Sequence, residues 1–279
     1  MISYIIGSKL FRLVVPVSRF LRQIFVLIAV LVLVACVAGP RGAGGQDQTT
    51  DSDESEVRKR ARPRLELALG YFEQGQVRVA LDEVKQALQQ DPAYAEAYNL
   101  RGMIYMRLDD MRLAEDSFRQ AMALNARDGN TLHNYGWLLC TQGRHADAIS
   151  LFSQAMTLPG YREGARTLMA LGLCQARAGF MADAEASLVK SYALDPVNPV
   201  TGYNLTRLLF QRGDNVRAQF YIRRLNNSEY ANAESLWLGI KVERKIGNLD
   251  AMRQLGDQMN KRFAQSREAQ WYVKGSFDE

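Results

Sequence analysis

Residues 132–158, LHNYGWLLCTQGRHADAISLFSQAMTL, decide the fold of this 279-residue chain. Apolar residues recur in them at helical spacing, at Leu132, Tyr135, Leu139, Ala148, Phe152 and Ala155. Gly143 interrupts the pattern near its middle, as glycine commonly does at a turn. The stretch therefore predicts two amphipathic helices joined by a tight turn.

The same pattern recurs along most of the chain. The residue at the turn appears six times, at Gly75, Asp109, Gly143, Gly179, Gly213 and Gly247, with spacings of 34 or 36 residues. Five positions after the turn stands a small residue in all but the last unit, at Ala80, Ala114, Ala148, Ala184 and Ala218. Four positions further stands a large apolar residue, at Val84, Phe118, Phe152, Leu188 and Ile222. A fixed period of this length predicts a stack of helical hairpins.

The period and the placement of small and large residues resemble the tetratricopeptide (TPR) repeat. The resemblance implies an all-α, right-handed TPR superhelix of six helix-turn-helix repeats over residues 61–279. We expect the repeats near residues 61–94, 95–128, 129–162, 165–198, 199–232 and 233–266, followed by a C-terminal capping helix over 267–275. Pro92 and Pro196 should end the second helices of the first and fourth units, because proline cannot continue a helix.

The first 35 residues read as a lipoprotein signal peptide. Residues 9–22 carry four cations and no acid, and residues 24–35 form an apolar run that is too short to span a bilayer comfortably. Residues 33–36, LVAC, resemble a bacterial lipobox, in which Cys36 would be lipidated and become the new amino terminus. An uncleaved membrane anchor, with Cys36 as an ordinary apolar residue, stays open as the alternative.

Residues 36–60 would then form a lipidated cysteine and a flexible tether, because this segment is rich in small and polar residues. Val37, rather than aspartate, follows Cys36. The resemblance to bacterial lipoproteins implies that a residue other than aspartate at this position directs the protein to the outer membrane, on its periplasmic face.

Charge and motifs argue against nucleic acid and catalysis. The four amino-terminal cations account for all but one of the five net positive charges, so the rest of the chain offers little attraction for nucleic acid. His133 and His145 have no partner at metal-ligand spacing, and no phosphate-binding glycine loop, GxSxG or HExxH motif occurs. We therefore predict no catalytic residue, metal or small-molecule substrate, and no cofactor besides a covalent lipid on Cys36.

The TPR resemblance also implies a protein-binding groove on the concave face, lined by fixed positions of each first helix. Those positions hold Asn99, Met103, Met106, His133, Trp137, Met169, Leu173, Tyr203, Arg207 and Phe210. Methionine and aromatic residues favour binding surfaces, and we expect Trp137 and His133 to be exposed there. A stripe of such residues at helical spacing also suits the protein core, and the sequence leaves both readings open.

Cys140 and Cys174 lie on the first helices of adjoining units, which pack side by side in a stack of this kind. We predict a disulfide between them, since disulfides persist in exported proteins. Two buried free thiols are the alternative, because free cysteine is among the most buried residue types.

Three local strings carry a more specific resemblance. They are NYGWLLC at residues 134–140, ALDP just before Val197, and FAQSREA at residues 263–269, where Arg267 replaces a proline that is common there. Together with the lipobox, the tether and the six repeats, they resemble the PilF/PilW family of type IV pilus biogenesis and stability lipoproteins. The resemblance implies a pilotin that binds the pilus secretin, or another pilus assembly protein, and promotes secretin multimerisation at the outer membrane. A general envelope scaffold for outer-membrane protein assembly or peptidoglycan enzymes is the alternative.

Overall fold

The computed structural model describes residues 54–278, which contain helices and turns but no strand. The expected signal peptide, Cys36 and nearly all of the expected tether lie outside these residues. The helices of the described range are α2 (Glu56–Glu73), α3 (Val77–Gln90), α4 (Ala95–Arg107), α5 (Met111–Leu124), α6 (Gly129–Thr141), α7 (His145–Thr157), α8 (Gly164–Arg177), α9 (Met181–Leu194), α10 (Pro199–Gln211), α11 (Asn215–Asn226), α12 (Ala233–Ile246), α13 (Leu249–Arg262) and α14 (Arg267–Lys274). Among them, no helix combines the length and the hydropathy needed to cross a membrane.

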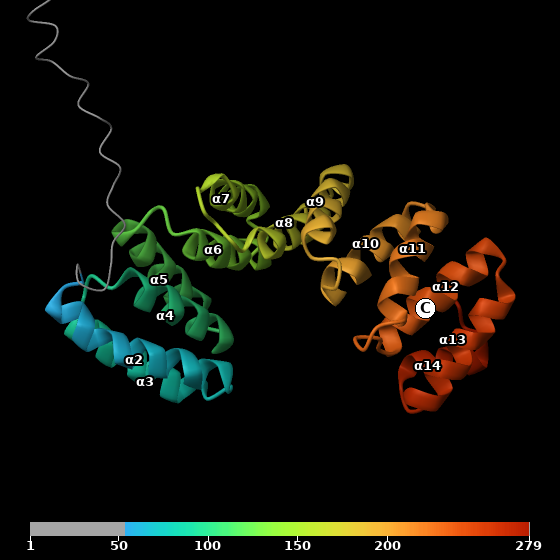
Figure 1. Cartoon of the computed structure of the whole chain (residues 1–279), viewed down its shortest axis with the longest axis horizontal. Coiled ribbons are helices and arrows are strands. Elements are labelled where there is room, and N and C mark those ends of the chain that lie inside the picture. Colours follow the sequence, from blue (N-terminus) through green and yellow to red (C-terminus); the bar gives the residue numbers. More distant parts are fainter. Residues whose placement is uncertain (1–53, 279) are drawn as a thin grey trace, which may run out of the picture. The chain divides into compact units, whose positions relative to one another are not determined.

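Consecutive helices pair into six hairpins, from α2 with α3 to α12 with α13 (Figure 1). Each second helix also packs on the first helix of the next hairpin, and the first helices contact one another in a row from α2 to α12. Helix α14 packs on both members of the last hairpin. This is the predicted arrangement of six helix-turn-helix repeats and a capping helix.

The six turns inside the hairpins share one backbone conformation. Gly75, Gly143, Gly179, Gly213 and Gly247 have φ between 76° and 86°, and Asp109 has φ 63°. This left-handed region favours glycine, and short polar residues such as aspartate tolerate it better than other side chains do. The six residues predicted to form turns therefore do lie between the two helices of each hairpin.

Helices within a hairpin approach closely at the small residues of the pattern. The five alanines at Ala80, Ala114, Ala148, Ala184 and Ala218 are completely buried. Gly102, Gly136 and Gly172 have no room for a side chain, because a Cβ there would lie 2.6–3.0 Å from atoms of Phe118, Phe152 or Leu188. The large apolar residues of the pattern therefore fill the space that these glycines leave on the first helix of the hairpin.

The first helix begins earlier than expected. Helix α2 starts at Glu56, and the Ser55 side chain caps it by accepting a hydrogen bond from the backbone N–H of Arg58. Arg58 also reaches the turn after α3, where it pairs with Asp91 and lies 3.8 Å from the centroid of the Tyr94 ring. The limit of the tether at residue 60 was therefore wrong, because a cap and a long-range ion pair hold residues 56–60 in the helix.

The last hairpin departs from the pattern because it receives the capping helix. A Cβ at Gly256 of α13 would collide with the ring of Tyr272, so this glycine allows α14 to approach α13. Trp271 lies 6.0 Å from Trp237 of α12, between ring centroids. Ser266 and Gly275 cap the two ends of α14, which confirms the predicted capping helix.

Candidate protein-binding groove

The first-helix side of the fourth to sixth hairpins carries two adjoining cavities, of about 480 and 360 Å³. The first cavity lies among α8, α9 and α10 and is lined by Leu173, Arg177 and Arg207, among others. The second is lined by residues of α10, α12 and α14. Arg207 and Gln211 line both cavities, so the two form one surface, which we call the first-helix groove.

Four of the predicted groove residues come together there, namely Leu173, Tyr203, Arg207 and Phe210. Trp137 of α6 lies next to this surface, since the Cζ atom of Arg177 is 5.1 Å from the centroid of its ring. Burial raises the pKa of Tyr203, with Glu234 and Glu268 adding to the effect, so its hydroxyl remains a hydrogen-bond donor at neutral pH. The groove combines aromatic surface with several cations.

The methionines of the predicted stripe serve the core as well as the surface. Met103, Met106 and Trp137 are half-buried and pack against the apolar cluster of the second to fourth hairpins. Met169 is half-buried against the next cluster. These side chains therefore contribute to the protein core and also keep part of their surface exposed for binding, so both interpretations of the stripe apply.

Two residues of the predicted groove are not exposed. His133 has only 7% of its surface accessible, because it is enclosed between α6, α7 and α8. Its Nδ1 atom lies 2.9 Å from Oγ1 of Thr167, and its ring lies 5.7 Å from that of Phe152. Asn99 is also buried and accepts a hydrogen bond from Nδ2 of Asn134. The expectation that His133 is exposed was wrong, and both residues join neighbouring repeats.

Burial lowers the pKa of His133 from 6.5 to about 3, with a smaller contribution from the nearby cation Arg166. The folded protein thus holds a neutral imidazole, whereas the unfolded chain binds a proton below about pH 6.5. We expect acid to destabilise the fold through this residue, by up to about 1.4 kcal/mol per pH unit between pH 6.5 and the folded pKa.

Urea unfolding at several pH values from 7 to 5 tests this expectation. The variant His133→Gln should show a shallower loss of unfolding free energy on acidification than the parent chain. His145→Gln, which removes the other histidine, on α7, is the matched control and should keep the parent slope. Equal slopes in the parent and in His133→Gln would contradict the assignment.

Cys140 of α6 and Cys174 of α8 are joined by a disulfide, and their Cα atoms are 5.8 Å apart. Both residues are buried in the cluster of the second to fourth hairpins. The bond links the first helices of the third and fourth units, and Cys174 directly follows the groove residue Leu173 in the sequence.

Sequence reasoning missed the carboxy-terminal half of the groove. Trp237, Lys241 and Trp271 line the second cavity together with Glu234 and Arg267. The positions that hold Tyr203 and Arg207 in the fifth unit hold Trp237 and Lys241 in the sixth, so the same rule would have selected these two residues. Trp271 and Arg267 belong to the capping helix, which has no counterpart in the other units.

Residues 54–278 hold no group of three or more His, Cys, Asp or Glu side chains placed to bind a metal ion. The groove itself offers aromatic contact area, charge, and apolar side chains that are at least partly exposed, such as Leu173 and Met181, which are the means of binding another chain.

Relatives of known structure share this architecture. PilF of Pseudomonas aeruginosa, a type IV pilus assembly protein, is 28% identical over 206 residues, which cover 74% of this chain and 82% of PilF. The crystal structure of PilW, a widely conserved type IV pilus biogenesis factor, matches with a TM-score of 0.71 and 29% identity, over 79% of this chain and 100% of PilW. A solved structure of Pseudomonas aeruginosa PilF matches with a TM-score of 0.70 and 27% identity, over 78% and 99% of the two chains.

Models of the tetratricopeptide repeat match residues 69–109, 93–159 and 133–199. With the six hairpins and the groove, they define the class: this is a TPR protein, built from repeats that typically bind other proteins. Within that class, the relatives place it in one family. The chain belongs to the TPR proteins of type IV pilus biogenesis.

Proposed function

We propose that this protein is a pilotin, which binds the pilus secretin in the first-helix groove and promotes its multimerisation at the outer membrane. The observation that carries the proposal is the groove itself, where the half-buried rings of Tyr203 and Phe210 on α10 and of Trp271 on α14 offer aromatic surface. Aromatic residues held on rigid helices are typical anchors of protein interfaces. Similarity to PilF and PilW supports a partner in pilus assembly.

The charges of the groove favour an acidic partner segment. Arg177, Arg207, Lys241 and Arg267 line the two cavities, against the carboxylates of Glu234 and Glu268. Such an excess of cations speeds association with a segment of opposite charge and disfavours a basic one. We expect the bound secretin segment to combine apolar and acidic residues.

The proposal includes a lipid anchor on Cys36, with no other cofactor and no nucleic-acid or small-molecule ligand. An acyl chain stabilises membrane binding by about 0.8 kcal/mol per buried methylene, so a multiply acylated cysteine would hold the protein at the outer membrane. Mass spectrometry of the mature amino terminus tests the anchor. A first residue other than acylated Cys36 would refute it.

A gene deletion complemented with variants tests the function. The deletion strain should lose secretin multimers and pili while its envelope permeability stays normal. Leu173→Asp should fail to restore the multimers and should weaken binding to purified secretin about tenfold or more, because it buries an unpaired charge in the interface. Val216→Asp, at an exposed position of α11 outside the groove, is the matched control and should restore them.

Two results would count against the proposal. Normal secretin multimers with a general permeability defect in the deletion strain would favour the envelope scaffold instead. Full complementation by a folded Leu173→Asp protein would remove the groove from the mechanism.

A further inference from the structure

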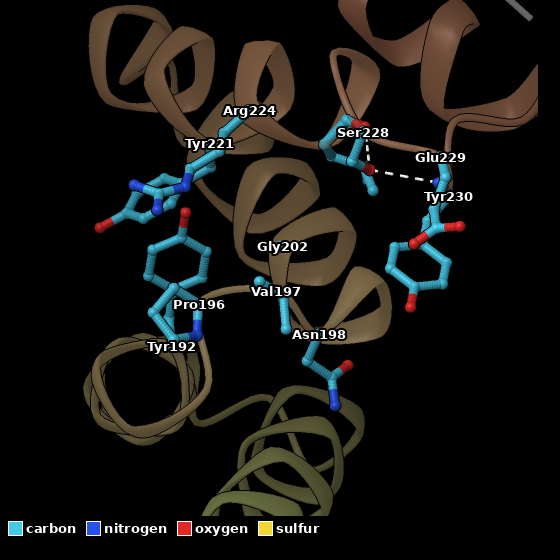
Figure 2. Close-up of a pocket in the computed structure, with 11 residues that line it drawn as sticks. Tyr192, Pro196, Val197, Asn198, Gly202, Tyr221, Arg224, Ser228, Glu229 and Tyr230 are labelled. Carbon is cyan, nitrogen blue, oxygen red and sulfur yellow. Dashed lines mark hydrogen bonds between the residues drawn. The ribbon is translucent and has the colours of Figure 1, made fainter.

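A separate pocket of about 450 Å³ lies among α9, α10 and α11 and the turns that follow α9 and α11 (Figure 2). It shares no lining residue with either cavity of the first-helix groove. Three tyrosines line it, Tyr192, Tyr221 and Tyr230, together with Val197, Gly202 and Arg224. We call it the tyrosine pocket.

The pocket is open at Gly202, although no close contact with a neighbouring helix requires a glycine there. Gly202 lies inside α10, where glycine is a poorer helix former than alanine. At Gly102, Gly136 and Gly172 a Cβ would press on the neighbouring helix, but at Gly202 it would meet no atom within 4 Å. The missing side chain therefore gives space to the pocket, not to the stacking of helices.

One end of the pocket is polar and lacks an acceptor. The hydroxyl of Tyr192 is buried and has no hydrogen-bond partner. Burial raises its pKa, so the group stays protonated and able to donate. Arg224 lies at the same end, on α11 beside Tyr221 (Figure 2), and pairs with no carboxylate of residues 54–278. Two donors without an acceptor favour an anion.

The rest of the pocket is apolar and open to solvent. Val197 and Tyr230 are 70% and 48% exposed, and the rings of Tyr192 and Tyr221 meet edge to face with centroids 4.8 Å apart. Glu229 lies beside Tyr230, at the end away from Arg224 (Figure 2), and would repel a second anion. The occupant that fits is therefore apolar with one carboxylate.

We propose that the tyrosine pocket binds an extended segment of a partner protein, which places a large apolar side chain over Gly202 and a carboxylate beside Arg224 and Tyr192. The pocket has the volume of a small ligand site, which suits one large side chain with its adjoining backbone. Because it lies apart from the first-helix groove, one chain can hold two partner segments at once.

A blocked peptide, acetyl-Gly-Phe-Asp-Gly-amide, is the probe for this site. Ligand-observed saturation-transfer NMR with the full chain should detect binding with a Kd of about 1 mM, the range expected for so few contacts. The same peptide with Asn in place of Asp should bind about tenfold more weakly, because it loses the charge-assisted hydrogen bonds.

Two variants and one control localise the binding. Gly202→Leu fills the pocket and should reduce binding at least tenfold, with a Tm no lower than that of the parent. Arg224→Gln should bring the Asp and Asn peptides to equal affinity. Gly70→Leu is the matched control, because Gly70 is the other helical glycine of residues 54–278 whose Cβ would meet nothing within 4 Å, and it lies on α2.

Three outcomes would overturn the proposal. The first is no binding of the peptide at 10 mM to the folded parent chain, roughly ten times the expected Kd. The second is equal binding to Gly202→Leu. The third is binding of free 3-phenylpropionate as tight as that of the peptide, which would mark a site for small carboxylic acids. None of these outcomes bears on secretin binding in the first-helix groove.

Discussion

Phe152→Ala is expected to lower the free energy of unfolding by about 3–5 kcal/mol, the largest effect of a single substitution that we predict. Phe152 is fully buried on α7 and fills the space left by Gly136 on α6, where a Cβ would lie 3.0 Å from its ring. Its ring also meets the edge of His133. Removing it leaves a cavity between α6 and α7, and urea unfolding followed by circular dichroism measures the loss.

Phe220→Ala is the matched control. This phenylalanine lies on α11 with 58% of its surface exposed, so its removal should change the unfolding free energy by no more than about 0.5 kcal/mol. A similar loss in both variants would show that the repeat core does not depend on the residue opposite the glycine.

Loss of the disulfide is expected to cost about 3–4 kcal/mol of stability. Cys140 and Cys174 are 34 residues apart, and closing a loop of that length restricts the unfolded chain considerably. The double variant Cys140→Ala/Cys174→Ala should therefore unfold at a lower urea concentration than the oxidised parent. Calorimetry should show a lower Tm.

Reduction gives the control for the disulfide. Dithiothreitol should shift the parent chain towards the double variant and leave the variant itself unchanged. Mass spectrometry that finds both thiols free in protein taken from the periplasm would contradict the bond. A double variant as stable as the oxidised parent would contradict its energetic role.

The repeat architecture could be predicted because each of its elements is local. A turn residue such as Gly143, an alanine such as Ala148 and a large residue such as Phe152 recur at fixed spacing, and each acts on a helix only a few positions away. The start of α2 could not be predicted in this way, because Arg58 is held by Asp91, far along the chain.

The candidate sites were less accessible to sequence reasoning. Positions in a repeat predict which face of a helix a residue occupies, but not how closely the next repeat covers it, so His133 and Asn99 were placed in the groove although α8 and α6 enclose them. The tyrosine pocket depends on side chains in the turns that follow α9 and α11, which the repeat pattern does not specify. The one sequence signal for the pocket is Gly202, which does not occupy the first-helix position shared by Gly102, Gly136 and Gly172.

The row of first helices has a mechanical consequence. Each hairpin touches only its neighbours. Small rotations at each contact therefore add along the row, which makes a repeat array of this kind elastic. The covalent link between α6 and α8 stiffens one contact near the middle. Under a pull on the two ends, the contact between α6 and α8 should therefore deform less than the other contacts of the row.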